Sequence, residues 1–446
     1  MVYKEKSNNT GILMKTNIED ISSVKKKLMI EIEAEEIDKR VNEAYKKFGK
    51  TAKIKGFRPG KAPKKILENY FGNDVLEDVT KSIIEETLLE AMEEHKTYPL
   101  NMPVIENEIL KTGQNYKYSA LFEVRPEFEL KDYLGIEVEK GKCVVNTEDV
   151  DRQLEQIREA RGKLRPVEEA RGIKEGDVVI IDYEGFDGDK AIEGVKAENY
   201  PIKIGDKQFF PGAEEALIGS KKNDNINITI DFKDDYFHSG LAGKRVDLKV
   251  KVTDIKEIVL PELDDEFAKT LGGDFDGLDK LREKIKEDLV ATEVKRIENE
   301  LRERLLGKIS EGVDFELPGS LVEHEIISAF ENIKQNLSRS GSSLEKSGLD
   351  EEKLKGEIRP GAEKRVKGML ILGEIAHQNN LTVEDADLTE NLKEMSKGMG
   401  VDPETMRKYY EAHNLMDGLR QILLKEKTLK YLVENAKVTE IPADKI

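Results

Sequence analysis

The chain has 446 residues, more than a single hydrophobic core usually organises, so two or three domains are expected. Hydrophobic residues make up 38% and charged residues 37%, while Trp is absent, a balance that favours helical and aliphatic packing over a large β-sandwich. The formal net charge of −18 argues against general nucleic-acid binding by the whole chain, although it leaves room for a local basic patch.

Cysteine, histidine and hydropathy patterns limit the chemistry further. The single Cys143 excludes an internal disulfide and a cysteine-rich metal site, and the five histidines show no metal-ligand spacing. No apolar stretch is long enough to span a bilayer, and residues 1–13 lack the apolar core of a secretory signal. We therefore expect a cytoplasmic protein with no membrane partner, cofactor or metal, and a disordered extension at residues 1–13.

Residues 14–126 are expected to form a compact α+β domain. Apolar and polar residues alternate in residues 22–33 and again in residues 116–124, which is the period of a half-buried strand. Residues 34–48 have helical character, and Asp74 is placed to cap a second helix whose apolar residues recur at helical spacing. Helices and strands so close together in the chain indicate one mixed core.

Residues 164–258 are expected to form a small antiparallel β domain. They follow a linker, residues 127–163, that contains a short charged helix. An apolar run at residues 178–181 and strict alternation at residues 226–232 and 246–252 predict strands separated by Gly and Asp turns.

Residues 259–446 are expected to be helical. Two apolar stripes recur at helical spacing, within residues 301–309 and 322–337. The Gly- and Ser-rich residues 338–343, and Pro360 with the glycine after it, are expected to break the helical series. No fixed-period repeat is present, which weakens a solenoid interpretation.

Residues 46–65 concentrate positive charge in an otherwise acidic chain. Nine Lys or Arg residues lie there with no Asp or Glu, and Phe57 and Arg58 sit between turn-forming Gly and Pro residues. An Arg beside an apolar ring suits a surface that combines phosphate, carboxylate and hydrophobic contacts, so salt-sensitive docking to a ribonucleoprotein is one interpretation. From charge alone, a solvated run around an ordinary turn is the other.

An octapeptide within this segment resembles the ribosome-binding signature of trigger factors, Gly-Phe-Arg-x-Gly-x-x-Pro. The resemblance implies docking beside the exit tunnel of the large ribosomal subunit. Many family members have Lys where this chain has Pro59, and the surrounding lysines offset the missing charge. The ribosome-binding residues implied are Gly56, Phe57, Arg58, Pro59, Gly60, Lys61 and Pro63.

The β domain is similar to FKBP-type peptidyl-prolyl isomerases in residues 178–185, 209–212 and 235–238. Isomerisation needs no nucleophile, because a dry apolar pocket can favour the twisted, less dipolar peptide over the planar one. From composition alone, the same aromatic residues could simply be the core of a small β domain. The resemblance assigns seven residues to the catalytic pocket: Tyr183, Glu193, Tyr200, Phe209, Phe210, Tyr236 and His238.

Three positions depart from the isomerase pattern. Ile192 and Leu248 replace pocket aromatics, and Ala213 stands where an aromatic residue normally forms the floor. We therefore expect a wider or shallower pocket and reduced isomerase activity.

Residues 317–322, 368–374 and 436–440 look like C-terminal segments of trigger factors. In that family the helical domain is discontinuous, because the linker before the isomerase domain packs with the helices after it. The fold class implied is α+β multidomain: an N-terminal α+β ribosome-binding domain, an FKBP-like antiparallel β domain and a discontinuous all-α C-terminal chaperone domain. Residues 127–163 then belong with residues 259–446.

The function implied is that of an ATP-independent, ribosome-associated chaperone that binds nascent and unfolded polypeptides, has prolyl isomerase activity and forms a weak homodimer off the ribosome. The sequence contains no Gly-rich phosphate loop, which agrees with ATP independence. Two alternatives stay open. One is a prolyl isomerase whose flanking domains recruit proline-containing substrates, and the other is a structural ribosome-associated or RNA-binding protein supported only by the basic segment.

Overall fold

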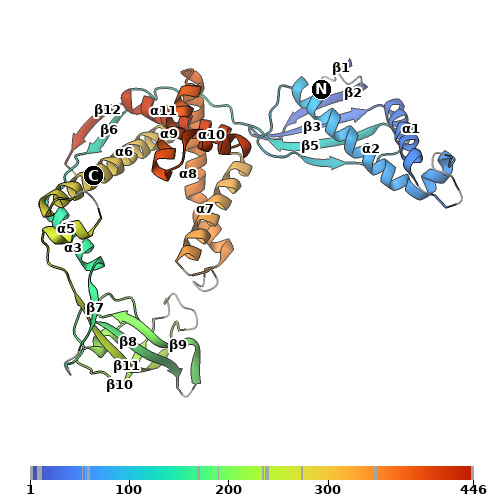
Figure 1. Ribbon diagram of the computed structural model, residues 1–446. Coiled ribbons are helices and arrows are strands. Elements are labelled where there is room, and N and C mark those ends of the chain that lie inside the picture. Colours follow the sequence, from blue (N-terminus) through green and yellow to red (C-terminus); the bar gives the residue numbers. More distant parts are fainter. Residues whose placement is uncertain are drawn as a thin grey trace. The chain divides into compact units, whose positions relative to one another are not determined.

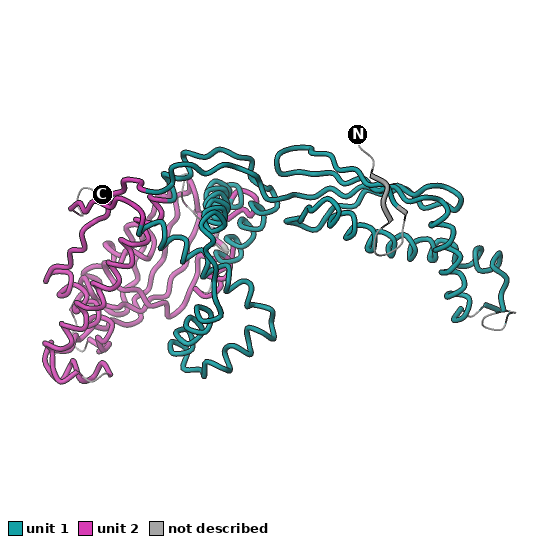
Figure 2. Tube along the Cα trace, turned by 90° about the horizontal axis from the view of Figure 1, so that it is seen from above, with its two compact units in different colours: residues 1–134, 306–333, 354–434 teal, residues 135–305, 334–353, 435–446 magenta. Residues whose placement is uncertain are grey.

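The chain divides into two compact units, which are coloured separately in Figure 2 and described one at a time below. The first comprises residues 1–134, 306–333 and 354–434, and the second comprises residues 135–305, 334–353 and 435–446. The computed structural model describes residues 4–7, 13–52, 54–55, 57, 61–167, 171–188, 190–233, 236, 241–272, 275–340, 342–344 and 349–442. Among these described residues, no helix has the length and apolar character needed to cross a membrane.

The first unit opens with a five-stranded antiparallel sheet and two helices that pack on it (Figure 1). Helices α1 (Ala34–Thr51) and α2 (Lys64–Glu94) share one apolar core with the buried faces of the central strands. The alternation in the sequence therefore predicted β3 and β5 correctly, while β1 forms within the expected disordered extension. In spatial order the strands are β1 (Lys4–Ser7), β2 (Leu13–Asp20), β3 (Lys25–Ile32), β5 (Tyr116–Glu123) and β4 (Val104–Asn107).

Helix α2 begins at Lys64, so the prediction of a helix capped by Asp74 is wrong. Phe71 has non-helical angles, φ −132° and ψ 17°, and marks a kink where two helical segments join. The segment before the kink is held by apolar contacts. Leu67 is buried in the core, and the Phe71 ring lies 5.7 Å from the Phe48 ring of α1. These contacts are made across the helical hairpin, so local sequence spacing did not reveal them.

The second unit contains the β-rich domain, whose strands pair antiparallel throughout. Alternate residues of β11 are almost fully buried, including Val246 and Val252, as the alternating pattern predicted. A short helix, α4 (Ala213–Leu217), packs on the same core. The strand order is β10 (Asn225–Asp231), β11 (Arg245–Val259), β8 (Val178–Asp187) and β9 (Lys190–Lys203), and β7 (Lys163–Pro166) pairs with the end of β11.

The segment before the β domain packs with the segment after it. Helix α3 (Thr147–Ala160) shares an apolar core with α5 (Asp265–Thr270) and the start of α6 (Leu278–Glu311). Strand β6 (Glu137–Gly141) pairs in parallel with β12 (Lys437–Ile441). The prediction that everything late in the chain is helical is therefore wrong at β12, whose partner strand lies 300 residues earlier.

The remaining described helices pack in two groups, whose apolar cores lie within the first unit. Helices α7 (Gly319–Arg339) and α8 (Glu351–Gln378) share one core, and α9 (Asp385–Met399), α10 (Pro403–Ala412) and α11 (Met416–Glu434) share another.

Pro360 lies inside α8, so the predicted break there is wrong. An internal proline costs about 3 kcal/mol, because it lacks an N–H and crowds the preceding turn. Ala362, Val366 and Leu370, which follow it, are buried against α7 and offset that cost.

Glu123, at the end of β5, caps the first turn of α7. The residue is 7% exposed, and its carboxylate accepts hydrogen bonds from the Ser320 backbone N–H at 2.8 Å and the Ser320 hydroxyl at 2.6 Å. The first N–H groups of a helix lack partners within the helix, and a negative charge there is favourable. A second bond has its donor on the side of the sheet: the Ser23 hydroxyl donates to the Glu316 carboxylate, just before α7, at 2.8 Å. These bonds tie the sheet of the first unit to its helices.

We expect Glu123→Ala to loosen the start of α7, because the N–H and the O–H of Ser320 both lose their charged acceptor. Hydrogen bonds to charged groups contribute about 1.5–3 kcal/mol each, so amide hydrogen exchange in the first turn of α7 should quicken by more than tenfold. Glu127→Ala is the matched control, since Glu127 is exposed. Equal exchange rates in the two variants would show that the cap does not hold this contact.

Candidate functional site: an aromatic cluster and a basic segment

The β domain gathers aromatic rings around Tyr183 of β8. The rings of Tyr200, Phe209 and Phe210 lie 5.6, 5.2 and 5.8 Å from the Tyr183 ring, each nearly edge-on to it. The Phe209 and Phe210 rings are 4.8 Å apart. Edge-to-face pairs at these distances are favourable and give an apolar wall with a fixed shape.

The cluster extends through Phe232, a residue that the sequence comparison with isomerases did not single out. Its ring lies 6.0 Å from Phe210 and 4.6 Å from Tyr236. Phe232 continues the apolar alternation of β10, which indicated a position in the core but gave no sign of its place in the aromatic cluster. Five of the seven predicted pocket residues thus join one cluster. The side chain of Glu193 and the whole of His238 lie outside the described residues.

The cluster is buried on one side and open on the other. Phe232 is 7% exposed, whereas Tyr200 is 41% exposed. Burial raises the pKa of the Tyr183 phenol, with a further contribution from Tyr200, and burial also raises the pKa of Tyr236. Both phenols therefore stay protonated at neutral pH, and the Tyr183 hydroxyl can donate a hydrogen bond to a peptide carbonyl.

The three departures from the isomerase pattern belong mainly to the core of the domain. Ala213 is 0% exposed and Leu248 is 1% exposed, while Ile192 packs against the same core. The aromatic wall is therefore built by rings from β8, β9 and the residues before α4, together with Phe232 and Tyr236.

The basic segment lies at the hairpin between α1 and α2. Ile54 is buried in the core of the sheet and helices, and its carbonyl accepts a hydrogen bond from the Phe57 N–H at 3.1 Å. Phe57 itself is 40% exposed. Gly56, Arg58, Pro59 and Gly60 lie outside the described residues, while Lys61 and Pro63 are exposed. Every described lysine of the segment is exposed: Lys46, Lys47, Lys50, Lys55, Lys61, Lys64 and Lys65.

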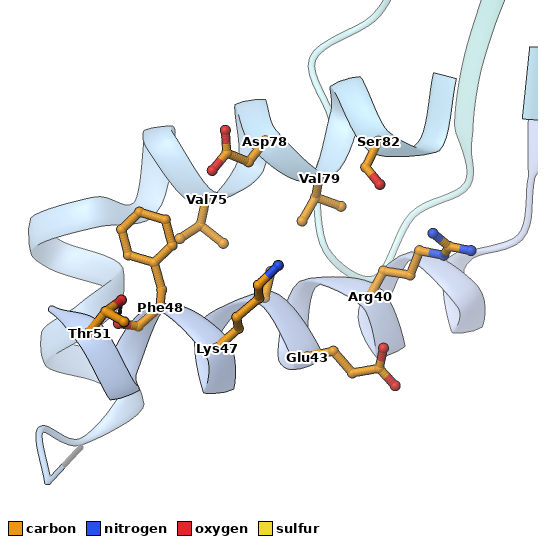
Figure 3. Close-up of a pocket in the computed structure, with 10 residues that line it drawn as sticks. Arg40, Glu43, Lys47, Phe48, Thr51, Val75, Asp78, Val79 and Ser82 are labelled. Carbon is orange, nitrogen blue, oxygen red and sulfur yellow. Dashed lines mark hydrogen bonds between the residues drawn. The ribbon is translucent and has the colours of Figure 1, made fainter. Parts of the chain in front are cut away.

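A groove of about 450 Å³ runs between α1 and α2 beside the basic segment (Figure 3). Phe48, Val75 and Val79 reach into it and form an apolar floor. Lys47 and Asp78 add charges of both signs to its walls. The hairpin therefore has a groove with an apolar floor and charged walls, next to the lysine-rich tip.

Metal chemistry has no candidate site in the part of the chain that the structure describes, since no three His, Cys, Asp or Glu side chains are grouped to hold an ion.

The fold defines a multidomain protein, in which a β domain with an aromatic cluster interrupts a helical region that follows an α+β domain. Family models describe the same three parts: bacterial trigger factor protein over residues 14–157, FKBP-type peptidyl-prolyl cis-trans isomerase over residues 169–253, and the trigger factor C-terminus over residues 277–434. The chain belongs to the trigger factor family.

Individual relatives agree over nearly the whole length. Trigger factor from Geotalea uraniireducens (strain Rf4) is 37% identical over 434 residues, covering 97% of this chain and 100% of that protein. Trigger factor from Geobacter metallireducens is 36% identical with the same coverage. A solved structure described as "Promiscuous Substrate Recognition in Folding and Assembly Activities of the Trigger Factor Chaperone" aligns at 23% identity and a TM-score of 0.48, over 94% of this chain and 99% of that one.

Family membership confirms several predictions made from the sequence. The chain is a ribosome-associated chaperone that interacts with nascent polypeptides and carries an FKBP-type peptidyl-prolyl isomerase domain. The predicted fold class, with α+β, β-rich and helical regions in that order, is also confirmed.

An aromatic residue restored at Ala213 should destabilise the isomerase domain. Ala213 is fully buried, so Ala213→Phe forces core side chains apart at a cost of about 1–3 kcal/mol. Denaturant unfolding of the isomerase domain, followed by hydrogen exchange in β11, measures the change.

Ala216→Phe is the control, because Ala216 is an exposed residue of the same helix. Its effect should stay within about 0.5 kcal/mol. A stable Ala213→Phe variant with higher isomerase activity would instead show that the site has an empty floor.

Proposed function

We propose that the loop between α1 and α2 docks the chain on the large ribosomal subunit beside the exit tunnel. The proposal is supported by the exposed Phe57 ring and by the exposed lysines that surround it. An aromatic ring flanked by cations combines a hydrophobic anchor with charge-assisted contacts to phosphate or carboxylate groups. The residues assigned to docking are Gly56, Phe57, Arg58, Pro59, Gly60, Lys61 and Pro63.

The charge distribution supports a single point of attachment. The whole chain carries a net charge of −18, so most of its surface is repelled by ribosomal RNA. Residues 46–65, which have only positive charges, are the exception. Binding through a few phosphate contacts weakens steeply as the salt concentration rises.

The aromatic cluster around Tyr183 is proposed as the isomerase site. Rotation about a prolyl peptide bond requires about 18–20 kcal/mol, because planar amide resonance is lost. An apolar wall of rings disfavours the planar, more dipolar amide relative to the twisted one, and a protonated phenol can donate to its carbonyl. The residues assigned to this site are Tyr183, Glu193, Tyr200, Phe209, Phe210, Tyr236 and His238, with Phe232 supporting the cluster from the core.

Client binding is proposed for the helices after the isomerase domain. Met399, Tyr409 and Ile422 are 65%, 54% and 61% exposed, on three helices that share one core. Exposed apolar side chains on a charged surface can hold unfolded segments weakly and reversibly, without nucleotide. Three further parts of the proposal rest on likeness to the family. They are a cytoplasmic location, a weak homodimer off the ribosome, and a division into domains at residues 14–126, 127–163, 164–258 and 259–446.

Phe57→Ala combined with Arg58→Ala should abolish ribosome association. The change removes the exposed ring and one cation from the hairpin tip but leaves the buried Ile54 anchor. Cosedimentation with ribosomes at low and high salt measures the effect, and wild-type binding should weaken as salt rises.

The control for that variant is Tyr98→Ala combined with Lys111→Ala, which removes an exposed ring and an exposed cation elsewhere in the same domain. This control should bind as wild type does, and both double variants should keep full isomerase activity. Undiminished cosedimentation of the Phe57 and Arg58 variant would exclude the loop as the docking site.

Tyr183→Ala should lower isomerase activity on a short proline peptide by at least about tenfold, equivalent to about 1.4 kcal/mol in transition-state stabilisation. The ring contacts three other rings of the cluster, so its removal opens the apolar wall. Suppression of aggregation of a proline-free client should be unchanged.

Tyr70→Ala, which removes a 67% exposed tyrosine from α2, is the control. This pair of assays also separates the chaperone from a protein that is primarily an isomerase. If Tyr183→Ala lost both activities while remaining folded, client protection would depend on the isomerase site.

A further inference from the structure

Glu214 is a buried carboxylate that bonds to the loop carrying Phe209 and Phe210. It lies on α4 and is 4% exposed. One carboxylate oxygen accepts hydrogen bonds from the backbone N–H groups of Gly205 at 2.9 Å and Lys207 at 3.1 Å, and the other accepts from Phe209 at 3.1 Å. A single side chain therefore bonds to every second residue of one loop, at positions 205, 207 and 209.

The charge state of Glu214 suits this role. Burial alone raises the pKa of a carboxyl group, but the backbone N–H groups of Phe209, Gly205, Lys207 and Gln208 outweigh burial and hold the pKa of Glu214 below its usual range. The side chain is therefore ionised at neutral pH. An ionised carboxylate is an acceptor only, which matches a site lined by N–H donors.

The loop needs such an anchor because its backbone is unusual. Gly205 has φ +104° and Lys207 has φ +54°, and a left-handed conformation is unfavourable for a residue with a side chain. At the far end, the Ala213 N–H donates to the Phe210 carbonyl at 3.0 Å. The backbone of the Phe209-Phe210 pair is thus fixed on both sides by residues of α4.

We propose that Glu214 is a positioning residue for the isomerase reaction. It holds Phe209 and Phe210 so that their rings stand edge-on to Tyr183 before substrate arrives. This inference rests on the proposed assignment of the aromatic cluster as the isomerase site. Glu214 itself acts only through the loop, since its carboxylate is occupied by backbone donors.

The loss of this anchor should raise KM rather than lower kcat. When only a fraction of the protein has the ring arrangement that binds substrate, the apparent affinity falls by that fraction. Once substrate is bound, it contacts the same arrangement of rings as in the wild type. In the full-length chain, Glu214→Gln replaces the acceptor with a group of the same shape that also carries N–H donors. We expect KM for a short proline peptide to rise about tenfold with kcat changed less than about twofold.

Glu215→Gln is the matched control, because Glu215 is the exposed neighbour on the same helix. It should keep the wild-type KM. Hydrogen exchange read by mass spectrometry provides a second measurement: residues 205–209 should be protected in the wild type and exchange faster in Glu214→Gln, with β11 unchanged.

The outcomes separate positioning from general stability. An unchanged KM in Glu214→Gln, or rapid exchange of residues 205–209 in the wild type, would overturn the inference. Loss of protection in β11, or failure of the variant to fold, would assign Glu214 to the stability of the domain instead. If Tyr183→Ala keeps full activity, the site assignment itself fails, whatever the loop exchange shows.

Discussion

The isomerase domain depends on how the chain enters and leaves it. Strand β7 pairs antiparallel with the last residues of β11, from Lys163 opposite Val259 to Pro166 opposite Lys256. Gly162 precedes this pairing, and a Cβ atom there would collide with the Ile258 side chain. Only glycine allows the two connections to approach so closely.

This close pairing lets a complete domain interrupt a helical region without breaking its core. Because entry and exit lie side by side, α5 and α6 return to pack with α3, and the Arg158 side chain donates to the Pro261 carbonyl at 2.7 Å. The β domain meanwhile encloses a core of its own. Two cores joined by paired strands can each keep their stability, which suits a chaperone that also carries a prolyl isomerase domain.

The sequence predicted the elements whose pattern is local. Alternation identified β3, β5 and β11, because apolar side chains at every second position line a buried face of each strand. Features that depend on distant contacts were missed. The first part of α2 is held by packing against α1, Pro360 is tolerated because of contacts with α7, and β12 exists through a partner near the start of the second unit.

The same distinction applies to the candidate site. Resemblance pointed to most of the aromatic rings, since these residue types stand in a recognisable order along the chain. Phe232 and Glu214 gave no such signal, because an apolar residue in a strand and an acidic residue in a helix are ordinary. Only the folded chain shows that one supports the ring cluster and the other accepts three N–H bonds from the loop before it.

Because prolyl isomerisation needs no nucleophile, the residues that fix the shape of the site matter more than any reactive group. Prolyl rotation is accelerated by a surface of defined shape and polarity, so at the proposed site the rings would contribute through their positions and not through reactivity. Positions on a loop are only as defined as the bonds that hold its backbone, and those bonds come from residues outside the pocket. A buried charge is costly unless it is fully hydrogen-bonded, and Glu214 meets that condition by ordering the loop. The same hydrogen bonds therefore stabilise the buried charge of Glu214 and fix the geometry of the apolar wall.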